Sequence, residues 1–409
     1  FPLSVIIGQA AISINYFLIA IITLIVLFKR RLFLNYKANL YLLFPFFLIL
    51  IISSIYNYYF LEYNSPIKSL LYLKNLFLVL FTIHILNNQK QINLFLKIIF
   101  FLCLFVAIDN YIQYFFGYDV FGYQKSKYRL TGPFGDNEYV TGAYLSKFLI
   151  LTLPLYFLNK KKNINLISVI YLVFFFCSIL ITGERASLFY FTIGFSIFIL
   201  IYIKNIKKLF LIFSSLILIL FLAINYNKTI NYKFLQTSYQ IGTLKFYSNV
   251  YDIPGQFKNY KDKNFFDSKH GAHFLTAYEI WKNFKIIGVG PKNFSLECKK
   301  DRYNKIDSDN YKYRCNTHPH NIYLELLSET GIAGLTSFLV IVIIIFNKIY
   351  KLLLIKRDPY LISSFSQVIS IVWPLTTSGS IISNFNGSFF WLNLGILIAI
   401  INIKKNEKK

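Results

Sequence analysis

Methionine is absent from this 409-residue sequence, and acidic residues are scarce, 18 against 43 Lys and Arg. The missing Met indicates that the natural start lies outside the sequence, so we expect the first predicted span to be truncated. The scarcity of acid leaves a net charge of +25, which in a soluble protein would favour nucleic acid as a partner. A mean hydropathy of +0.51 and 56% hydrophobic residues exclude a soluble protein of ordinary composition. We therefore expect no nucleic-acid partner.

Long apolar runs dominate the chain. Repeated runs of about 18 residues or more indicate transmembrane helices, and together with shorter apolar runs we expect about 12 spans. Because backbone groups in lipid must be hydrogen-bonded within the protein, the expected fold is an all-α polytopic membrane protein. The first two spans are expected at 1–14 and 16–28, and the tenth begins near Gly331.

Basic residues gather in the gaps between alternate apolar runs. If the spans alternate in direction, these clusters all fall on one side, which the positive-inside rule identifies as the cytoplasm, together with both chain ends. The clusters lie at 29–31, 87–91, 159–163, 204–208, 347–357 and 404–409. Such clusters also favour contact with anionic membrane lipids.

A long polar stretch follows the ninth span and predicts a large loop on the outer side of the membrane between helices 9 and 10; the resemblance described below makes this side the periplasm. It divides the chain into three parts. We expect helices 1–9 in residues 1–224, the loop and a candidate catalytic segment in 225–330, and helices 10–12 with a basic cytoplasmic tail in 331–409.

Arginine is rare, with only seven among the 43 basic residues, so each Arg is a candidate for oxyanion binding, which its forked guanidinium performs better than Lys. Arg185 lies in a very short outer turn beside Gly183, where a cation suits an anionic headgroup or a diphosphate. An ion pair with Glu184, or an interfacial position, is the alternative. Arg129 lies in the first outer loop, where solvation or pairing with nearby acid is the alternative.

Histidines lie where the long loop meets the tenth span. His318 and His320 flank Pro319, and a His beside a membrane span indicates a functional group. The alternative is that they anchor the helix at the lipid headgroups. Downstream, Glu325 and Glu329 are one turn apart, and we expect them on the polar face of this helix.

Three further features occur within the loop. Gly288 and Gly290 predict a tight turn after an amphipathic helix expected over 271–284. Cys298 and Cys315 share this loop, and we expect them to form a disulfide; two free thiols are the alternative, since spacing alone does not prove connectivity. His270 and His273 share a helix face and suggest a metal site with His320, but without an HExxH motif or a Cys/His cluster we expect neither a metal nor another cofactor.

Together these segments resemble the O-antigen ligase and O-antigen polymerase family of bacterial envelope proteins. His320-Asn321, a nine-residue spacer and Gly331-x-x-Gly334 are similar to the ligase signature. The turn at Arg185 resembles the family's outer Arg, the segment with Gly288 and Gly290 its glycine turn, and the loop with Arg129 its first outer loop. The similarity extends over about 105–345.

The resemblance implies a metal-independent membrane glycosyltransferase at the periplasmic face of the inner membrane. A ligase transfers a glycan from an undecaprenyl-diphosphate carrier to a sugar hydroxyl of lipid A–core, and a polymerase transfers it to another lipid-linked repeat. A flippase would instead show inverted repeats with polar groups at mid-membrane, and we find no such repeat. A scaffold that only binds envelope glycolipid is a third alternative.

Residue roles follow from this chemistry. A leaving diphosphate needs counter-charge, which suits Arg185, and the attacking hydroxyl needs a base, which suits His320. We expect these two residues to line one cavity that opens to lipid. The family's second outer Arg is replaced here by His270 or His273, with Arg129, Arg314 or Lys74 as substitutes. The expected substrate-binding residues are Arg129, His318, His273, Arg314 and Asn321, and the structural ones are Cys298, Cys315, Gly288, Gly290, Gly331 and Gly334.

Overall fold

The computed structural model of the chain describes residues 1–28, 30–61, 67–157, 166–240, 265–306, 308, 311–355, 357–375, 377 and 379–407. Apart from one antiparallel bridge between Tyr118 and Gln124, these residues form helices and irregular segments only. The predicted all-α class is confirmed for this part of the chain. The basic cluster expected at 159–163 and the central part of the long loop lie outside the described residues.

The α-helices, in chain order, are α1 (Pro2–Ile7), α2 (Gln9–Phe28), α3 (Arg30–Leu61), α4 (Ile67–Leu70), α5 (Leu73–Ile85), α6 (Gln89–Phe116), α7 (Thr141–Phe157), α8 (Leu166–Ile181), α9 (Arg185–Tyr202), α10 (Ile206–Tyr226), α11 (Lys228–Gln240), α14 (Lys269–Asn283), α15 (Phe294–Glu297), α16 (Ile322–Ile355), α17 (Pro359–Ile371) and α18 (Asn384–Asn406). Short 3₁₀ turns lie at Gly132–Phe134, Phe265–Asp267, Asp301–Tyr303 and Tyr311–Tyr313.

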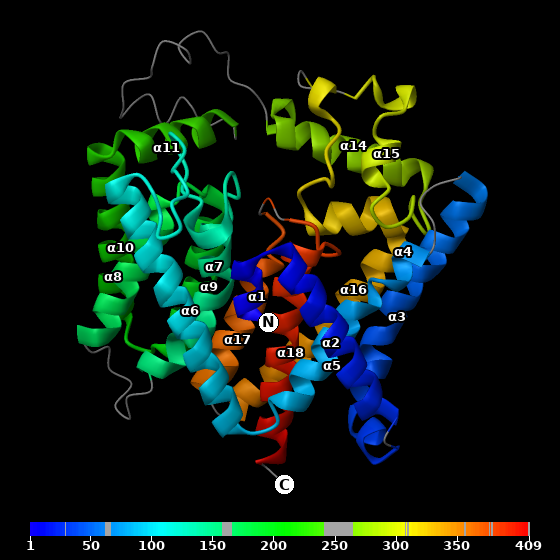
Figure 1. The fold of residues 1–409 in the computed structure, drawn as a ribbon, viewed down its shortest axis with the longest axis horizontal. Helices are drawn as coiled ribbons and strands as arrows, with labels where there is room; N and C mark the ends of the chain where they lie inside the picture. The colour runs from blue at the N-terminus through cyan, green and yellow to red at the C-terminus, as the bar shows by residue number, and fades with distance from the viewer. Residues whose placement is uncertain are drawn as a thin grey trace.

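Helix α18 forms the centre of the bundle. It packs against α5 on one side and α17 on the other, and nearly all of its apolar length is buried. Figure 1 shows α6 to α10 as a lobe on one side of this centre and α2, α3, α5 and α16 on the other. Across the upper end lie α11 on the first lobe and α14 and α15 on the second. The upper end is therefore built from the segments that carry the candidate site.

Seven helices of the described part are long and apolar enough to cross a membrane. They are α2, α6, α9, α16 and α18 over their full lengths, with Lys37–Leu61 of α3 and Leu209–Tyr226 of α10. Large apolar side chains such as Phe17, Phe101 and Ile343 point outward from them, as lipid contact requires. The expected total of 12 spans stays a prediction.

The expected boundary between the first two spans is wrong. Helix α2 continues through residue 15, because the Asn15 amide donates to the carbonyl of Ala11 one turn earlier and so stays within the helix. The break lies instead at Gly8, which has φ 122°. In Figure 1 the N-terminal end of the chain lies near the middle of the bundle and the C-terminal end at its lower edge. The expectation that both ends lie in the cytoplasm stays a prediction.

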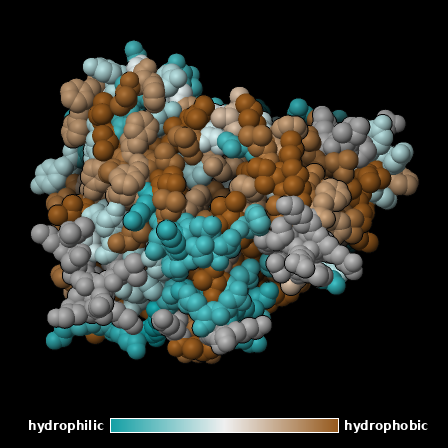
Figure 2. Space-filling model, turned by 60° about the horizontal axis from the view of Figure 1, so that its bottom comes forward, coloured by the Kyte–Doolittle hydropathy of each residue, from teal (hydrophilic) through white to brown (hydrophobic). Residues whose placement is uncertain are grey.

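The lower end of the bundle carries its own polar contacts. Lys404 forms an ion pair with Asp358 at 3.0 Å, and the Arg357 guanidinium donates to the carbonyl of Ile201. Figure 2 shows a hydrophilic patch on this underside, bordered by hydrophobic side chains. The predicted basic tail, 404–409, begins at this end.

Local signals explain several helix starts at the two ends. Asp358 caps α17, where Pro359 occupies the first turn without needing a hydrogen-bond donor. Ser383 caps α18 by accepting from the N–H groups of Asn386 and Gly387. Ser268 does the same for α14 and thereby orients the helix that carries two histidines.

A backbone-to-backbone contact joins the loop to α16. The helix breaks at Gly331, with φ 64° and ψ −165°, and the turn at Gly288 docks against this break. The N–H groups of Val289 and Ile332 donate to the carbonyls of Ser328 and Lys285. A Cβ at Gly331 would lie 2.2 Å from the carbonyl oxygen of Ile286, so only Gly fits.

Candidate active site

Three histidines meet at the upper end of the bundle. His270 and His273 project from the first turns of α14, and His320 comes from the segment just before α16. The His320 ring centroid lies 5.2 Å from that of His270 and 5.3 Å from that of His273. The His318 ring lies 4.3 Å from that of His320. We call His270, His273 and His320 the histidine cluster.

The segment that carries His320 is fixed at several points. Cys298 and Cys315 form a disulfide with their Cα atoms 5.4 Å apart, so the expected pairing is present. Arg314 Nε donates to the carbonyl of Cys298 at 3.0 Å, which engages part of its guanidinium in the loop fold. His320 has φ 59°, a left-handed conformation that is uncommon outside Gly and that cross-links of this kind can maintain.

Asn321, an expected substrate-binding residue, has most of its polar atoms engaged by the protein. Its Oδ1 accepts from the N–H groups of Tyr323 and Leu324, which caps α16, and its Nδ2 donates to the carbonyl of Pro374. Its side chain is also buried. We assign it to holding the start of α16.

Hydrogen bonds define the protonation state of His320. The Asn316 Oδ1 accepts from the N–H of Thr317 at 2.7 Å, so its Nδ2 is the donor that faces His320 Nε2 at 2.9 Å. Nε2 therefore carries a lone pair, and in the neutral ring the proton resides on Nδ1. His318 Nδ1 pairs with the Thr317 hydroxyl at 2.9 Å.

Burial keeps the histidine cluster neutral. Removal from water lowers the pKa of His320 to about 3, with smaller effects from His318, His270 and His273. The pKa of His273 is lowered to about 4, first by burial and then by His270. Neutral imidazoles are the forms that accept a proton or bind a metal ion. Their ligand atoms all lie within 4.8 Å of one another, so these three residues are able to hold a metal ion.

Arg185 begins α9 and points toward α11. Its Nη1 donates to the Thr237 hydroxyl at 2.9 Å. The alternative of an ion pair with Glu184 is not realised among the described contacts. The Glu184 carboxylate instead accepts from the N–H groups of Gly142 and Ala143 and from the Ser187 hydroxyl. Arg185 is thus not neutralised by its sequence neighbour.

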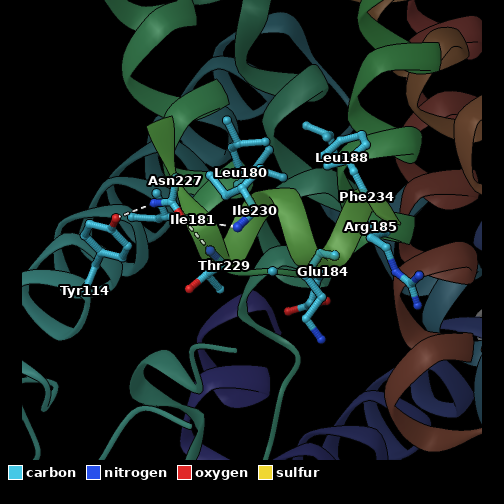
Figure 3. Close-up of a pocket in the computed structure, with 13 residues that line it drawn as sticks. Tyr114, Leu180, Ile181, Glu184, Arg185, Leu188, Asn227, Thr229, Ile230 and Phe234 are labelled. Atoms are coloured by element: carbon cyan, nitrogen blue, oxygen red, sulfur yellow. Dashed lines mark hydrogen bonds between the residues drawn. The ribbon is translucent and has the colours of Figure 1, made fainter. Parts of the chain in front are cut away.

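A small pocket opens beside Arg185. Its walls are apolar, from α8, α9 and α11, while Glu184, Arg185 and Lys233 supply its charged groups. In Figure 3 the polar ends of Glu184 and Arg185 extend to the same side, away from Leu180 and Ile181. The pocket thus combines an apolar wall with a cationic edge.

Positive charge is concentrated around this edge. Burial, together with the charges of Arg129 and Arg185, lowers the pKa of Lys233 to about 8. Arg129 itself lies over the Tyr139 ring at 5.8 Å. The structure therefore brings Arg129 and Arg185 together, as expected, and adds Lys233, which sequence patterns did not indicate.

Arg185 and the histidine cluster are electrostatic neighbours. The charge of Arg185 contributes to lowering the pKa of His270, which in turn contacts His320. However, the residues that line the Arg185 pocket include no histidine. The expectation of one cavity lined by both Arg185 and His320 is therefore not met by this pocket, although both belong to the same end of the molecule.

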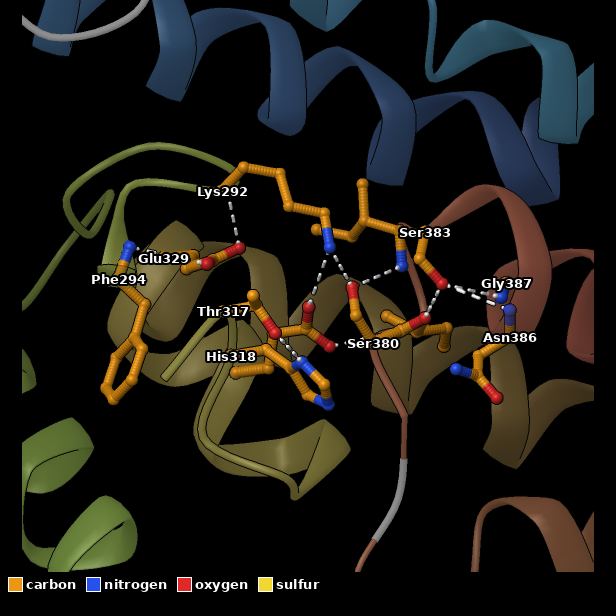
Figure 4. Close-up of polar contacts among 12 residues, drawn as sticks. Lys292, Phe294, Thr317, His318, Glu329, Ser380, Ser383, Asn386 and Gly387 are labelled. Carbon is orange, nitrogen blue, oxygen red and sulfur yellow. Dashed lines mark hydrogen bonds and ion pairs between the residues drawn. The ribbon is translucent and has the colours of Figure 1, made fainter. Parts of the chain in front are cut away.

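Glu325 and Glu329 are fully buried and do not form an exposed polar face. Glu329 accepts the backbone N–H of Lys292, and Glu325 accepts that of Ile381 while lying 3.9 Å from the Lys292 ammonium. In Figure 4 the Lys292 side chain extends to Ser380 while its backbone N–H faces Glu329. The same ammonium forms the ion pair with Glu325. The two Glu residues hold the glycine turn and the 380–383 segment against α16.

Sequence reasoning missed three contributors to the site. Lys233 lies on α11, a helix that the long-loop interpretation did not predict, and its amphipathic pattern was the available signal. Thr237 lies one turn further along the same helix and pairs with Arg185. Asn316 lies next to His320 because of the path that the chain takes after the disulfide, and no sequence motif indicated it.

Comparison with known proteins agrees with the sequence motifs. Residues 170–339 match the family model described as O-antigen ligase. No match was found among curated proteins. The match includes Arg185, the glycine turn and the histidine cluster, and it confirms the family resemblance for this region. With its apolar helices, the chain is a multi-pass membrane protein.

Proposed function

From the premise that this chain is a member of the O-antigen ligase family, we propose that it transfers a glycan from an undecaprenyl-diphosphate carrier to a sugar hydroxyl of lipid A–core. The observation that supports this most directly is the juxtaposition of a cationic, apolar-walled pocket with a cluster of three histidines whose rings contact one another. One binds an amphiphilic anion, and the other accepts a proton.

The proposed donor has an anionic diphosphate and an apolar prenyl chain, and the pocket offers a contact for each. A diphosphate attached to a prenyl chain needs cations at one end and apolar contact at the other. Arg185 and Lys233 provide the charge at the edge, and Arg129 adds to it. Ile230 and Phe234 of α11 and Leu188 of α9 provide apolar wall. The cationic groups also stabilise the charge that develops on the leaving diphosphate.

His320 is the proposed base. The acceptor hydroxyl replaces Asn316 at Nε2, and its oxygen attacks the anomeric carbon of the donor sugar. A carbon–oxygen bond forms as the bond from the anomeric carbon to the phosphate oxygen breaks, the bonding pair leaves with the diphosphate, and the hydroxyl proton passes to Nε2. In this scheme Arg and Lys charges neutralise the diphosphate, so the reaction is metal-independent. His318 and His273 border the place of the acceptor.

The proposed setting is the bacterial inner membrane, with the upper end of Figure 1 in the periplasm and the Asp358–Lys404 end in the cytoplasm. A matched pair of single Cys substitutions tests this. Lys282→Cys on exposed α14 should react with an impermeant thiol reagent in cells opened only at the outer membrane, and Glu407→Cys should not. The opposite pattern would invert the proposed orientation.

The deciding experiment is reconstitution. Purified protein in lipid vesicles is given an undecaprenyl-diphosphate glycan and, separately, lipid A–core or a second lipid-linked repeat. We expect product with lipid A–core. Product only with the second repeat would make the protein a polymerase, and movement of intact donor across the bilayer without product would make it a flippase. Binding of the donor without either outcome would leave a non-catalytic scaffold.

A further inference from the structure

The histidine cluster has a property that proton acceptance does not require. His270 Nδ1 and His273 Nδ1 are both buried without a hydrogen-bond partner among the described residues. His273 is 5% exposed, so water does not compensate for its bare nitrogen. Buried polar atoms are nearly always satisfied, so two bare imidazole nitrogens in one place are typical of a site that binds a ligand.

The second nitrogen of His273 shows how its ring is held. The backbone of Tyr313 lies at the His273 ring and acts on it as a hydrogen-bond partner, and Nδ1 is the ring nitrogen that has no partner among the described residues. Metal-binding histidines are typically oriented in this way, by a backbone carbonyl or carboxylate on the nitrogen that does not bind the metal. His320 likewise has a defined lone pair on Nε2, which faces Asn316.

We propose that His270, His273 and His320 form a binding site for a divalent transition-metal ion, of which Zn²⁺ is the best match. Their ligand atoms lie within 4.8 Å of one another, and the rings would draw closer around the ion to reach the Zn–N distance of about 2.1 Å. Three neutral imidazoles without a carboxylate favour Zn²⁺ over Mg²⁺ or Ca²⁺, which prefer oxygen ligands.

The consequence of metal binding for transfer rests on the proposed function. A metal ion on His320 Nε2 occupies the lone pair that would accept the hydroxyl proton. Zn²⁺ is therefore an inhibitor of this enzyme and not its cofactor, and its site overlaps the place of the acceptor. This agrees with a transfer step in which Arg185 and Lys233 supply the counter-charge.

Calorimetric titration of the purified, detergent-solubilised protein with ZnCl₂, in the absence of glycan substrates, tests the site. We expect one Zn²⁺ per chain, and Co²⁺ in the same site should give the visible absorption of a tetrahedral nitrogen complex. His270→Ala and His273→Ala should each weaken binding by more than about 10-fold. His84→Ala on α5 is the matched control and should bind as the unmodified protein does.

Absence of binding, or equal binding in all four proteins, would overturn the proposal. Because His270 is less buried than His273, its variant keeps the test valid if His273→Ala fails to fold. The binding measurement does not depend on activity, so it stands whether or not the protein transfers glycan. Where transfer is measured, Zn²⁺ should abolish it and a chelator should restore it, and full activity at saturating Zn²⁺ would exclude the inhibitory role.

Discussion

The Asn316 Nδ2 lies 2.9 Å from His320 Nε2, and the Thr317 N–H fixes the Asn316 amide in the orientation that donates to this nitrogen. The contact keeps a lone pair on Nε2 and the proton on Nδ1. It therefore holds the ring in the tautomer that a proton acceptor requires, and it connects a residue outside any motif to the proposed base.

Substitution of Asn316 tests this connection. Asn316→Asp places a carboxylate beside Nε2, which will draw the ring proton onto that nitrogen and remove its lone pair. We expect transfer to fall by about 10²-fold or more, in the range typical of losing a general base. Asn316→Ala should cost less, because it leaves the lone pair in place. The rates are compared in vesicles with both substrates, and equal rates for the two variants would argue against tautomer control.

Replacement of Arg185 tests the diphosphate contact. Arg185→Lys should fail nearly as badly as Arg185→Ala, because an ammonium does not make the two parallel hydrogen bonds of a guanidinium. Loss of such a donor to developing charge typically costs about 10²- to 10³-fold in rate. Thr237→Val removes only the partner of Nη1 and serves as the milder control. Near-normal transfer by the Lys variant would show that charge alone is sufficient.

Lys233 predicts a pH dependence of donor binding. Its pKa is lowered to about 8 by burial and by Arg129 and Arg185, so it is charged below this pH and neutral above it. Glu184 shares its pocket, and the Tyr128 ring lies 5.4 Å from the ammonium. Donor affinity should therefore weaken as the pH rises through about 8. In Lys233→Arg the donor affinity should not change with pH over this range. If its affinity fell with rising pH as in the unmodified protein, Lys233 would be excluded as the cause.

The disulfide predicts a loss of loop stability on its removal. Replacing both Cys298 and Cys315 by Ser releases a loop with a sequence separation of 17. Closing a loop of this size stabilises by about 3 kcal/mol. Limited proteolysis should cut between these positions much faster, whereas Cys177→Ser in α8 should leave the pattern unchanged. Recovery of both thiols in alkylated form from the unreduced, unmodified protein would contradict the pairing.

Local sequence patterns predicted those parts of the site that depend on short-range chemistry. Arg185 in a short turn, the glycine pair at 288 and 290, and the histidines before α16 all lie at the upper end, as alternation of apolar runs indicates. Other features depend on contacts that periodicity does not encode. Burial of Glu325 follows from its bond to the Ile381 N–H, far along the chain. The role of Asn316 follows from its contacts with the His320 ring and the Thr317 N–H.

The docking of Gly288 against Gly331 bears on how this protein can be recombined with relatives. A Cβ at Gly288 would lie 2.3 Å from the backbone of Glu329, and one at Gly331 would lie 2.2 Å from that of Ile286. Neither segment therefore tolerates a partner that differs in backbone path. A chimera that exchanges the loop alone will lose the backbone contacts between the glycine turn and α16. Exchange of 285–290 together with 328–333 transfers both sides of this contact. These two segments are far apart in the sequence, but they have to be exchanged together.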